Sequence, residues 1–194
     1  MRRDDASAVD PAIDEDDRPL RRGWSTGACA AAAARAATQA LLGGGFPESV
    51  EIELPRGLRS VFELAETAMS GVSARVAVRK DAGDDPDVTH GALIVAEVCR
   101  AAPGAGIVFR AGEGVGMVTR PGLPIPVGEP SITPAPRQYI SQAVSSIAEA
   151  AGVPVDFEIT LSVPGGKRLA EKTMNARLGI IGGLSILGTT GVVI

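Results

Sequence analysis

The sequence predicts an α+β domain in which a strand-rich, mixed or antiparallel sheet packs with two or three helices. An alanine-dense run over residues 28–42 has the boundaries of a helix. Several other segments alternate apolar and polar residues with the period of two that is typical of half-buried strands. Turns, and not helices, separate most of these segments, which argues against a wholly parallel sheet.

The first helix is predicted over residues 28–42 because both of its ends carry clear signals. Ser25 or Thr26 offers a capping hydroxyl before the run, and three consecutive glycines from Gly43 end it. Arg35 is the only charged residue in the run. Most of the helix surface is therefore expected to be covered by other parts of the protein.

Six short strands are predicted after this helix. Residues 49–54 and 58–64 are expected to form a hairpin, because apolar residues alternate on both sides of a Pro-Arg-Gly turn. The remaining four strands flank an acidic loop or a glycine-rich connection, and we expect them over residues 72–78, 93–98, 107–109 and 117–119.

A second helix is predicted from Thr133, followed by Pro134 at the first helical position, to Gly152. Its apolar side is expected to hold Ile140, Val144, Ile147 and Ala151. The cleanest alternation in the chain follows at residues 153–163 and predicts a strand with one solvated face. Residues 167–173 are expected to add a short helix after a Pro-Gly-Gly turn.

The two ends of the chain have opposite compositions. Residues 1–19 carry seven carboxylates with almost nothing apolar between them, so we expect a disordered acidic tail and not a secretory signal. Residues 178–194 carry no charge, but they hold five glycines and fall short of the roughly 20 residues of a membrane-spanning helix. Buried strand and loop is the better interpretation, and residues 20–194 are expected to form one domain.

Composition argues against several classes of function. A net charge of −4 and 3% aromatic residues leave neither a basic field nor stacking platforms for nucleic acid. Cys29 and Cys99 lie far apart and outside any CxxC pair, so no disulfide framework or zinc site is indicated. We therefore expect a globular protein of the reducing cytoplasm with no nucleic-acid and no membrane partner.

The acidic loop over residues 81–91 is the first segment that could carry chemistry. Four carboxylates and the only histidine of the chain fall within ten positions, namely Asp81, Asp84, Asp85, Asp87 and His90. Crowded carboxylates need a cation, a proton or backbone amides to relieve them, so the cluster suits acid–base chemistry or a metal. The alternative is that aspartates cap turns around Gly83 and Pro86. A metal site is not expected, because a lone histidine is more often structural.

The Gly-Glu-Gly-Val-Gly segment over residues 112–116 matches the alternating glycines of many nucleotide-binding and S-adenosylmethionine-binding loops. The motif works through a strand before the glycines and a helix after them. Here the following Met-Val-Thr-Arg is strand-like, so we reject a Rossmann fold and an ordinary nucleotide-binding domain. The segment is either a hairpin turn or a glycine loop lying against a flat ligand.

Two terminal segments and one arginine complete the candidates. The amides of Thr26 and Gly27 could hold a carboxylate, although ordinary helix capping is the commoner use. The glycines near Thr189 and Thr190 either pack backbone tightly or let these amides face a ligand. Arg137, on the second helix, could act as a carboxylate clamp.

Six segments of the chain are more specific in their order than any is alone. They are RRGWSTGACA (21–30), DAGDDPDVTHG (81–91), GEGVGMVT (112–119), PVGEPSITPAPR (126–137), VPGG (163–166) and NARLGIIGGLSILGTTG (175–191). Together they resemble the cobalt-precorrin-5B C(1)-methyltransferase (CbiD) family. The resemblance runs from about residue 20 to the end of the chain.

The resemblance implies transfer of a methyl group from S-adenosyl-L-methionine to carbon 1 of a cobalt-bound tetrapyrrole. The product would be cobalt-precorrin-6A, in anaerobic cobalamin (vitamin B12) biosynthesis. It also implies a fold that is not a Rossmann methyltransferase, in agreement with the strand-like segment after Gly116. The competing class is a non-catalytic tetrapyrrole-binding or assembly module, which has no use for a methyl donor.

Residue chemistry and position in the matching motifs assign the expected roles. The residues expected to be catalytic are Asp81, Asp84, Asp85 and His90. Those expected to bind S-adenosyl-L-methionine are Gly112, Glu113, Gly114, Gly116, Thr189 and Thr190. Those expected to bind the tetrapyrrole are Thr26, Gly27, Arg137 and Arg177, and no metal held by the protein itself is expected.

The sequence also departs from the family pattern. Trp24 and Ser25 stand where tyrosine and threonine are more usual, and Ala176 stands where proline is usual. Family members continue past the Gly-Thr-Thr-Gly string, so we expect this chain to stop before a second carboxyl-terminal domain. An uncovered strand in such a chain would favour a homo-oligomer.

Overall fold

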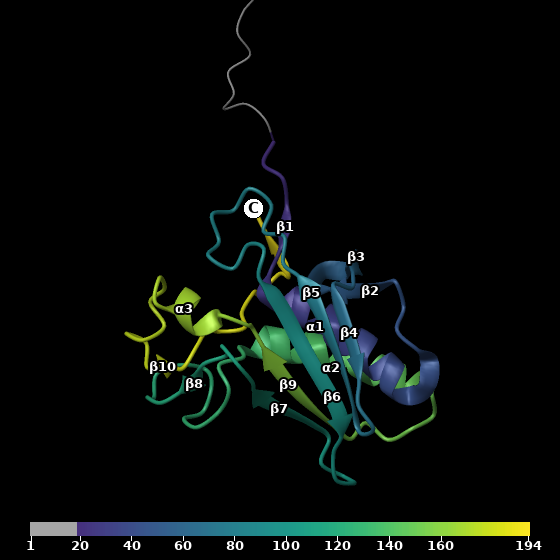
Figure 1. Ribbon diagram of the computed structural model, residues 1–194. Helices are drawn as coiled ribbons and strands as arrows, with labels where there is room; N and C mark the ends of the chain where they lie inside the picture. Colours follow the sequence, from purple (N-terminus) through teal and green to yellow (C-terminus); the bar gives the residue numbers. More distant parts are fainter. Residues whose placement is uncertain (1–18) are drawn as a thin grey trace, which may run out of the picture.

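The computed structural model describes residues 19–194, and Figure 1 shows its main sheet with two long helices behind it. The predicted acidic tail therefore lies, except for its last residue, outside the described residues. The five-stranded sheet has the order β4-β5-β6-β9-β7. In that order its strands span Glu66–Met69, Ser73–Arg79, Leu93–Arg100, Phe157–Ser162 and Ile107–Ala111.

The sheet is mixed, as predicted. Neighbouring strands are antiparallel except for β7, which runs parallel to β9. The inward residues Phe157, Ile159 and Leu161 of β9 are fully buried, which confirms the predicted alternation, but the strand begins at Phe157 and not at residue 153. Strand β4 was not predicted, because all four of its residues are exposed and no burial pattern marks it in the sequence.

Helices α1 (Thr26–Gln39) and α2 (Pro134–Ala150) cover one face of the sheet (Figure 1). Ser25 caps α1 by accepting a hydrogen bond from the amide of Ala28 at 3.2 Å. Twelve of the fourteen residues of α1 are buried, because the alanine surface lets the sheet and α2 approach from opposite sides. A π-helical turn, Ala40–Gly44, ends the helix at the predicted glycines.

The apolar side of α2 differs in part from the prediction. Ile140, Val144 and Ala148 are buried, but Ile147 is only half-buried and Ala151 is exposed. The stripe instead continues through Tyr139 and Ala143, and this residue spacing is that of a helix packed along its length on α1.

A hairpin packs beside α1 and forms a sheet of its own. It consists of β2 (Ser49–Leu54), a 3-10 turn η3 (Pro55–Gly57) and β3 (Leu58–Glu63), as predicted. Three residues of β2 face the core, namely Val50, Ile52 and Leu54. The hairpin thus forms a wall next to the two helices.

The remaining elements are short. Strand β1 (Gly23–Trp24) pairs with β11 (Val192–Val193), and β8 (Met117–Val118) pairs with β10 (Ile180–Ile181). Helix α3 spans Gly166–Ala170 and is shorter than predicted. The glycine-rich carboxyl-terminal segment is strand and loop, as predicted, and no helix within residues 19–194 could cross a membrane.

Candidate active site

The amino terminus of α1 is the point where three distant segments of the chain meet. The amide of Trp24 donates to the carbonyl of Asp81 at 2.7 Å, and Trp24 pairs with Val192 on its other side. One residue later, the amide of Ser25 donates to the carbonyl of Gly191 at 2.9 Å. The acidic loop, the start of α1 and the last segment of the chain are therefore adjacent (Figure 1).

Thr26 and Gly27 are buried at this meeting point. The Gly27 amide donates to the carbonyl of Leu187 at 3.1 Å, and the amide of Ala28 donates to the Ser25 hydroxyl. Capping and tertiary contacts therefore use these donors. The Thr26 side chain is buried, and its hydroxyl has no hydrogen bond to any residue of the described chain.

Tyr139 closes the helix terminus from the side of α2. Its hydroxyl donates to the carbonyl of Gly188 at 2.8 Å, and a side chain at Gly27 would overlap it. Burial raises the pKa of Tyr139 to about 12, so the phenol stays protonated at neutral pH. Sequence reasoning missed this residue, although it is the only tyrosine in the chain.

The outer aspartates of the acidic loop are tied to Arg21. The Asp81 carboxylate accepts from Nη2 of Arg21 at 2.9 Å and from the amide of Gly83 at 2.9 Å. These bonds lower the pKa of Asp81 to about 2. Asp84 accepts from the backbone amide of Arg21 at 2.7 Å. The crowding of carboxylates seen in the sequence is thus relieved by a cation and by amides, and the turn-capping interpretation holds for Asp81.

A buried ion pair anchors the other side of the loop. The ammonium group of Lys80, whose side chain is fully buried, lies 2.6 Å from Oδ2 of Asp87. The Asp87 carboxylate also accepts from the amide and hydroxyl of Thr89 at 2.7 and 2.6 Å. Burial opposes the charge on Asp87, but these hydrogen bonds outweigh it and lower its pKa. Sequence reasoning missed Lys80; its place directly before the acidic loop was the available signal.

Asp85 and His90 are the groups of the loop that remain open to a ligand. No hydrogen bond or ion pair ties the Asp85 side chain to the residues from 19 onward. Nδ1 of His90 accepts from the amide of Ala82 at 3.1 Å, so the neutral ring carries its proton on Nε2 and is half-exposed. Within the described residues, no group of three or more acidic, histidine or cysteine side chains is placed to hold a metal.

Acid should weaken the fold through Asp81. Its folded pKa, about 2, lies below the value of about 3.9 expected when unfolded. The pair therefore contributes full stability above about pH 4 and loses it as the pH falls toward about 2. Urea unfolding of the wild type and of Asp81→Asn across this range should show the two midpoints converging at low pH. A constant difference would show that Asp81 is not stabilised as an anion.

The glycine loop over residues 112–116 is held by backbone hydrogen bonds to other segments of the chain. The amide of Gly112 donates to Leu161, and the amide of Gly116 donates to Leu184, each at 2.8 Å. The predicted alternative of a hairpin turn is wrong, because the flanking strands β7 and β8 belong to different sheets. The exposed Glu113 side chain accepts from the amide of Gly165. The hydrogen bonds of the loop to other segments go to residues 161–165, to Leu184 and to Ser131, and not to the acidic loop.

Arg137 and Arg177 lie apart from the α1 terminus. Arg137 donates to the carbonyl of Ile132 at 2.9 Å and to Glu129 at 3.2 Å, and its guanidinium lies 5.2 Å from the centre of the Phe109 ring. It separates two cavities of about 400 and 420 Å³. Arg177 is exposed after α3 and has no hydrogen bond to the described residues. The structure therefore does not gather all the predicted substrate ligands in one place.

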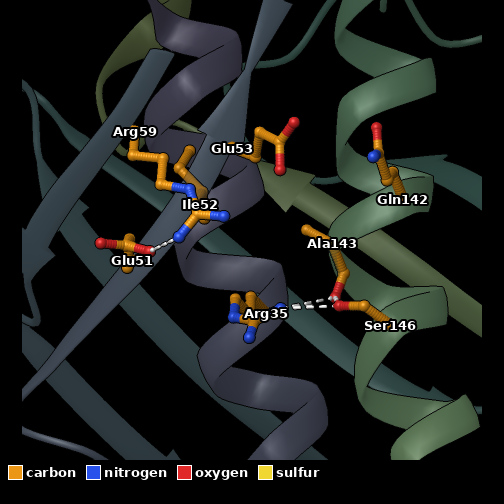
Figure 2. Close-up of a pocket in the computed structure, with 8 residues that line it drawn as sticks. All are labelled: Arg35, Glu51, Ile52, Glu53, Arg59, Gln142, Ala143 and Ser146. Carbon is orange, nitrogen blue, oxygen red and sulfur yellow. Dashed lines mark hydrogen bonds and ion pairs between the residues drawn. The ribbon is translucent and has the colours of Figure 1, made fainter. Parts of the chain in front are cut away.

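A polar groove runs between the hairpin and α2. Figure 2 shows its outer part, a cavity of about 310 Å³ with Arg35 at its base and Arg59 and Glu51 paired at 3.3 Å on one wall. The inner part, about 330 Å³, includes Thr189. Glu53 and Gln142 line both parts, so the two cavities are adjacent along the space between the hairpin and α2, which we call the groove. Its α2 wall is a helical stripe of small and amide side chains with one tyrosine, namely Ala135, Gln138, Tyr139, Gln142, Ala143 and Ser146.

The inner end of the groove reaches the α1 terminus. Thr189 lines it together with Tyr139, whose hydroxyl is next to Gly27. Thr190 turns the other way, since its hydroxyl donates to the carbonyl of Val192 at 2.9 Å. Of the predicted ligands, Thr26, Gly27 and Thr189 are thus brought to the α1 terminus, with a groove that can hold an elongated polar molecule.

Known proteins share both the sequence and the fold of this chain. The family model described as CbiD matches residues 13–194. The chain belongs to the CbiD family. A solved CbiD structure, the cobalamin biosynthesis protein from Archaeoglobus fulgidus, is 36% identical with a TM-score of 0.70 and covers 90% of this chain and 55% of that chain. The predicted family and the α+β fold that is not of the Rossmann type are confirmed.

Curated CbiD relatives carry one name. The cobalt-precorrin-5B C(1)-methyltransferase of Agrobacterium fabrum is 60% identical over 94% of this chain and 48% of its own length. That of Paramagnetospirillum magneticum is 59% identical over 92% of this chain and 50% of its own length. The chain therefore spans about half the length of the curated relatives it matches.

Proposed function

We propose that this chain takes part in methylation of carbon 1 of cobalt-precorrin-5B with S-adenosyl-L-methionine as the methyl donor. The observation that carries the proposal is membership of a family whose curated relatives bear that name at about 60% identity. The meeting of three of its matching segments at the α1 terminus, beside a polar groove, supports it. The cobalt ion belongs to the substrate, and the reaction would take place in the cytoplasm.

Methyl transfer from a sulfonium requires little acid–base catalysis by the protein. Placing the carbon nucleophile in line with the methyl group and excluding water supply most of the rate. Asp85 is suited to face the sulfonium charge, because Arg21 and Lys80 already neutralise Asp81 and Asp87. The Nε2 proton of His90 can donate to a carboxylate of the substrate.

The donor is proposed to lie in the groove that ends at Thr189. The amides of Gly112 and Gly116 are occupied by backbone bonds, so this loop is assigned to backbone packing and not to cradling an anion. Thr26, Arg137 and Arg177 remain proposed contacts for the acidic side chains of the tetrapyrrole. A substrate of that size would have to extend well beyond the α1 terminus to meet both arginines.

Replacing Asp84 and Asp85 by asparagine should depress turnover while the fold stays intact. Asp84 is exposed and Asp85 partly exposed, and an asparagine oxygen can still accept from the Arg21 amide that Asp84 binds, so the expected loss is electrostatic and not structural. We expect the rate to fall by roughly two orders of magnitude, as for the loss of one preorganised electrostatic group. Single-turnover kinetics with circular dichroism of the same samples measure both quantities. Unchanged turnover would remove the loop from the mechanism.

The whole proposal is tested by anaerobic incubation of the chain with cobalt-precorrin-5B and S-adenosyl-L-methionine. Mass spectrometry of the tetrapyrrole should show the gain of one methyl group, with the Agrobacterium fabrum relative as the positive control. Retention of the tetrapyrrole without binding of the methyl donor would instead identify a binding or assembly module. Gain of a methyl by the relative alone would show that catalysis needs regions absent from this chain.

A further inference from the structure

The inner part of the groove carries one free negative and one free positive side chain. Glu53 lines it from β2, and Arg56 lines it from the adjacent turn. Neither side chain has an ion-pair partner within residues 19–194, whereas Glu51 on the same strand is paired with Arg59. Figure 2 shows the Glu53 carboxylate and the Gln142 amide extending toward the groove from opposite walls.

The backbone at Arg56 is held in an unusual conformation. Its φ of 66° is the only positive value of a non-glycine residue in the part of the chain that the structure describes. Such a conformation is disfavoured for a residue with a long side chain and is retained where its surroundings fix it. Here it fixes the direction in which the Arg56 side chain leaves the turn, and that exposed side chain lines the inner part of the groove.

Two opposite charges in one groove match a ligand that carries both. An α-amino-acid group presents an ammonium and a carboxylate on the same carbon atom. A carboxylate such as Glu53 binds the first, and a guanidinium with neighbouring amides binds the second. A ligand bearing only carboxylates would meet the charge of Glu53, so the acidic tetrapyrrole fits this position poorly.

We propose that Glu53 and Arg56, with Gln138 and Gln142, form the site for the amino-acid end of the methyl donor. This inference rests on the proposed function, which supplies a donor with a methionine-derived amino-acid group. The same cavity reaches Thr189 and Tyr139, so a donor held here has its sulfonium within the region next to the α1 terminus. Glu53 and Arg56 are thus positioning residues for the donor.

The test compares two ligands that differ in the amino-acid part. S-adenosylhomocysteine retains it, and methylthioadenosine lacks it. In calorimetric titrations of the full chain, Glu53→Gln should weaken binding of the first ligand roughly tenfold or more, the usual loss for a charged hydrogen bond. Binding of methylthioadenosine should not change. Glu149→Gln, which removes the same charge from an exposed position on α2 outside the groove, serves as the matched control.

Arg56→Gly separates binding from folding. This substitution removes the guanidinium and relieves the positive φ, so the urea midpoint should rise while binding of S-adenosylhomocysteine falls. If the wild type binds neither S-adenosylmethionine nor S-adenosylhomocysteine, the proposed function itself fails. If it binds them and both groove variants behave like Glu149→Gln, the assignment of the amino-acid site is wrong and the function stands. Equal weakening of both ligands would also overturn the assignment.

Discussion

Asp87→Asn should lower the free energy of unfolding by about 3–5 kcal/mol, the usual cost of removing one partner from a buried ion pair. The Lys80 ammonium would remain fully buried without an anion, since its hydrogen-bond partner is the Asp87 carboxylate. Against a total stability of about 5–15 kcal/mol for an ordinary domain, this loss is large. Urea unfolding followed by circular dichroism measures it, and the midpoint should fall steeply.

Two further variants show that burial causes the effect. Arg21→Gln breaks the pair with Asp81, whose side chains are 56% and 49% exposed, and should cost less than about 1 kcal/mol. Combining Lys80→Met with Asp87→Asn removes both charges and should recover much of the loss. If Asp87→Asn and Arg21→Gln lower the free energy of unfolding by the same amount, Lys80 is not a buried cation, and the acidic loop is not anchored as described.

Local signals explain which elements the sequence could predict. Helix α1 has its cap, its alanines and its terminal glycines within one short stretch, and the hairpin has its turn between two alternating segments. The error at the glycine loop arose because strand pairing is not local. The sequence predicted a strand over residues 107–109, but the partner of the observed strand, Ile107–Ala111, is Phe157–Ser162, far along the chain and parallel.

The candidate site was harder to predict for the same reason. Position in a motif marked Asp81 and Asp87, but their protonation depends on Arg21 and on the buried Lys80, and burial of a lysine cannot be read from its neighbours in sequence. The groove is still harder to predict from the sequence, because its walls come from a hairpin and a helix about 80 residues apart in the chain. Glu53 has no signal in the sequence beyond its place on the solvated face of a strand.

Gly114→Ala should be at least as damaging as the loss of the ion pair. Gly114 has a φ of 72°, and a Cβ there would overlap the carbonyl oxygen of Val163 and crowd the backbone of Gly166. The clashing atoms are backbone atoms, which cannot move aside as a side chain can. The hydrogen-bonded contact between the loop and the end of β9 would therefore have to open. We expect a loss of about 4 kcal/mol or more, in the range of exceptional single substitutions.

Gly165→Ala is the control that isolates the close approach. Its φ of 74° is nearly the same, but a Cβ there would meet nothing within 4 Å. It therefore carries only the conformational strain, about 1–2 kcal/mol. Urea midpoints of the two variants measure the difference directly. A similar loss of unfolding free energy in both variants would mean that the positive φ alone explains Gly114, and the loop would then be free to lie against a ligand. A much larger loss for Gly114→Ala means that this glycine serves backbone packing, and the donor must bind elsewhere.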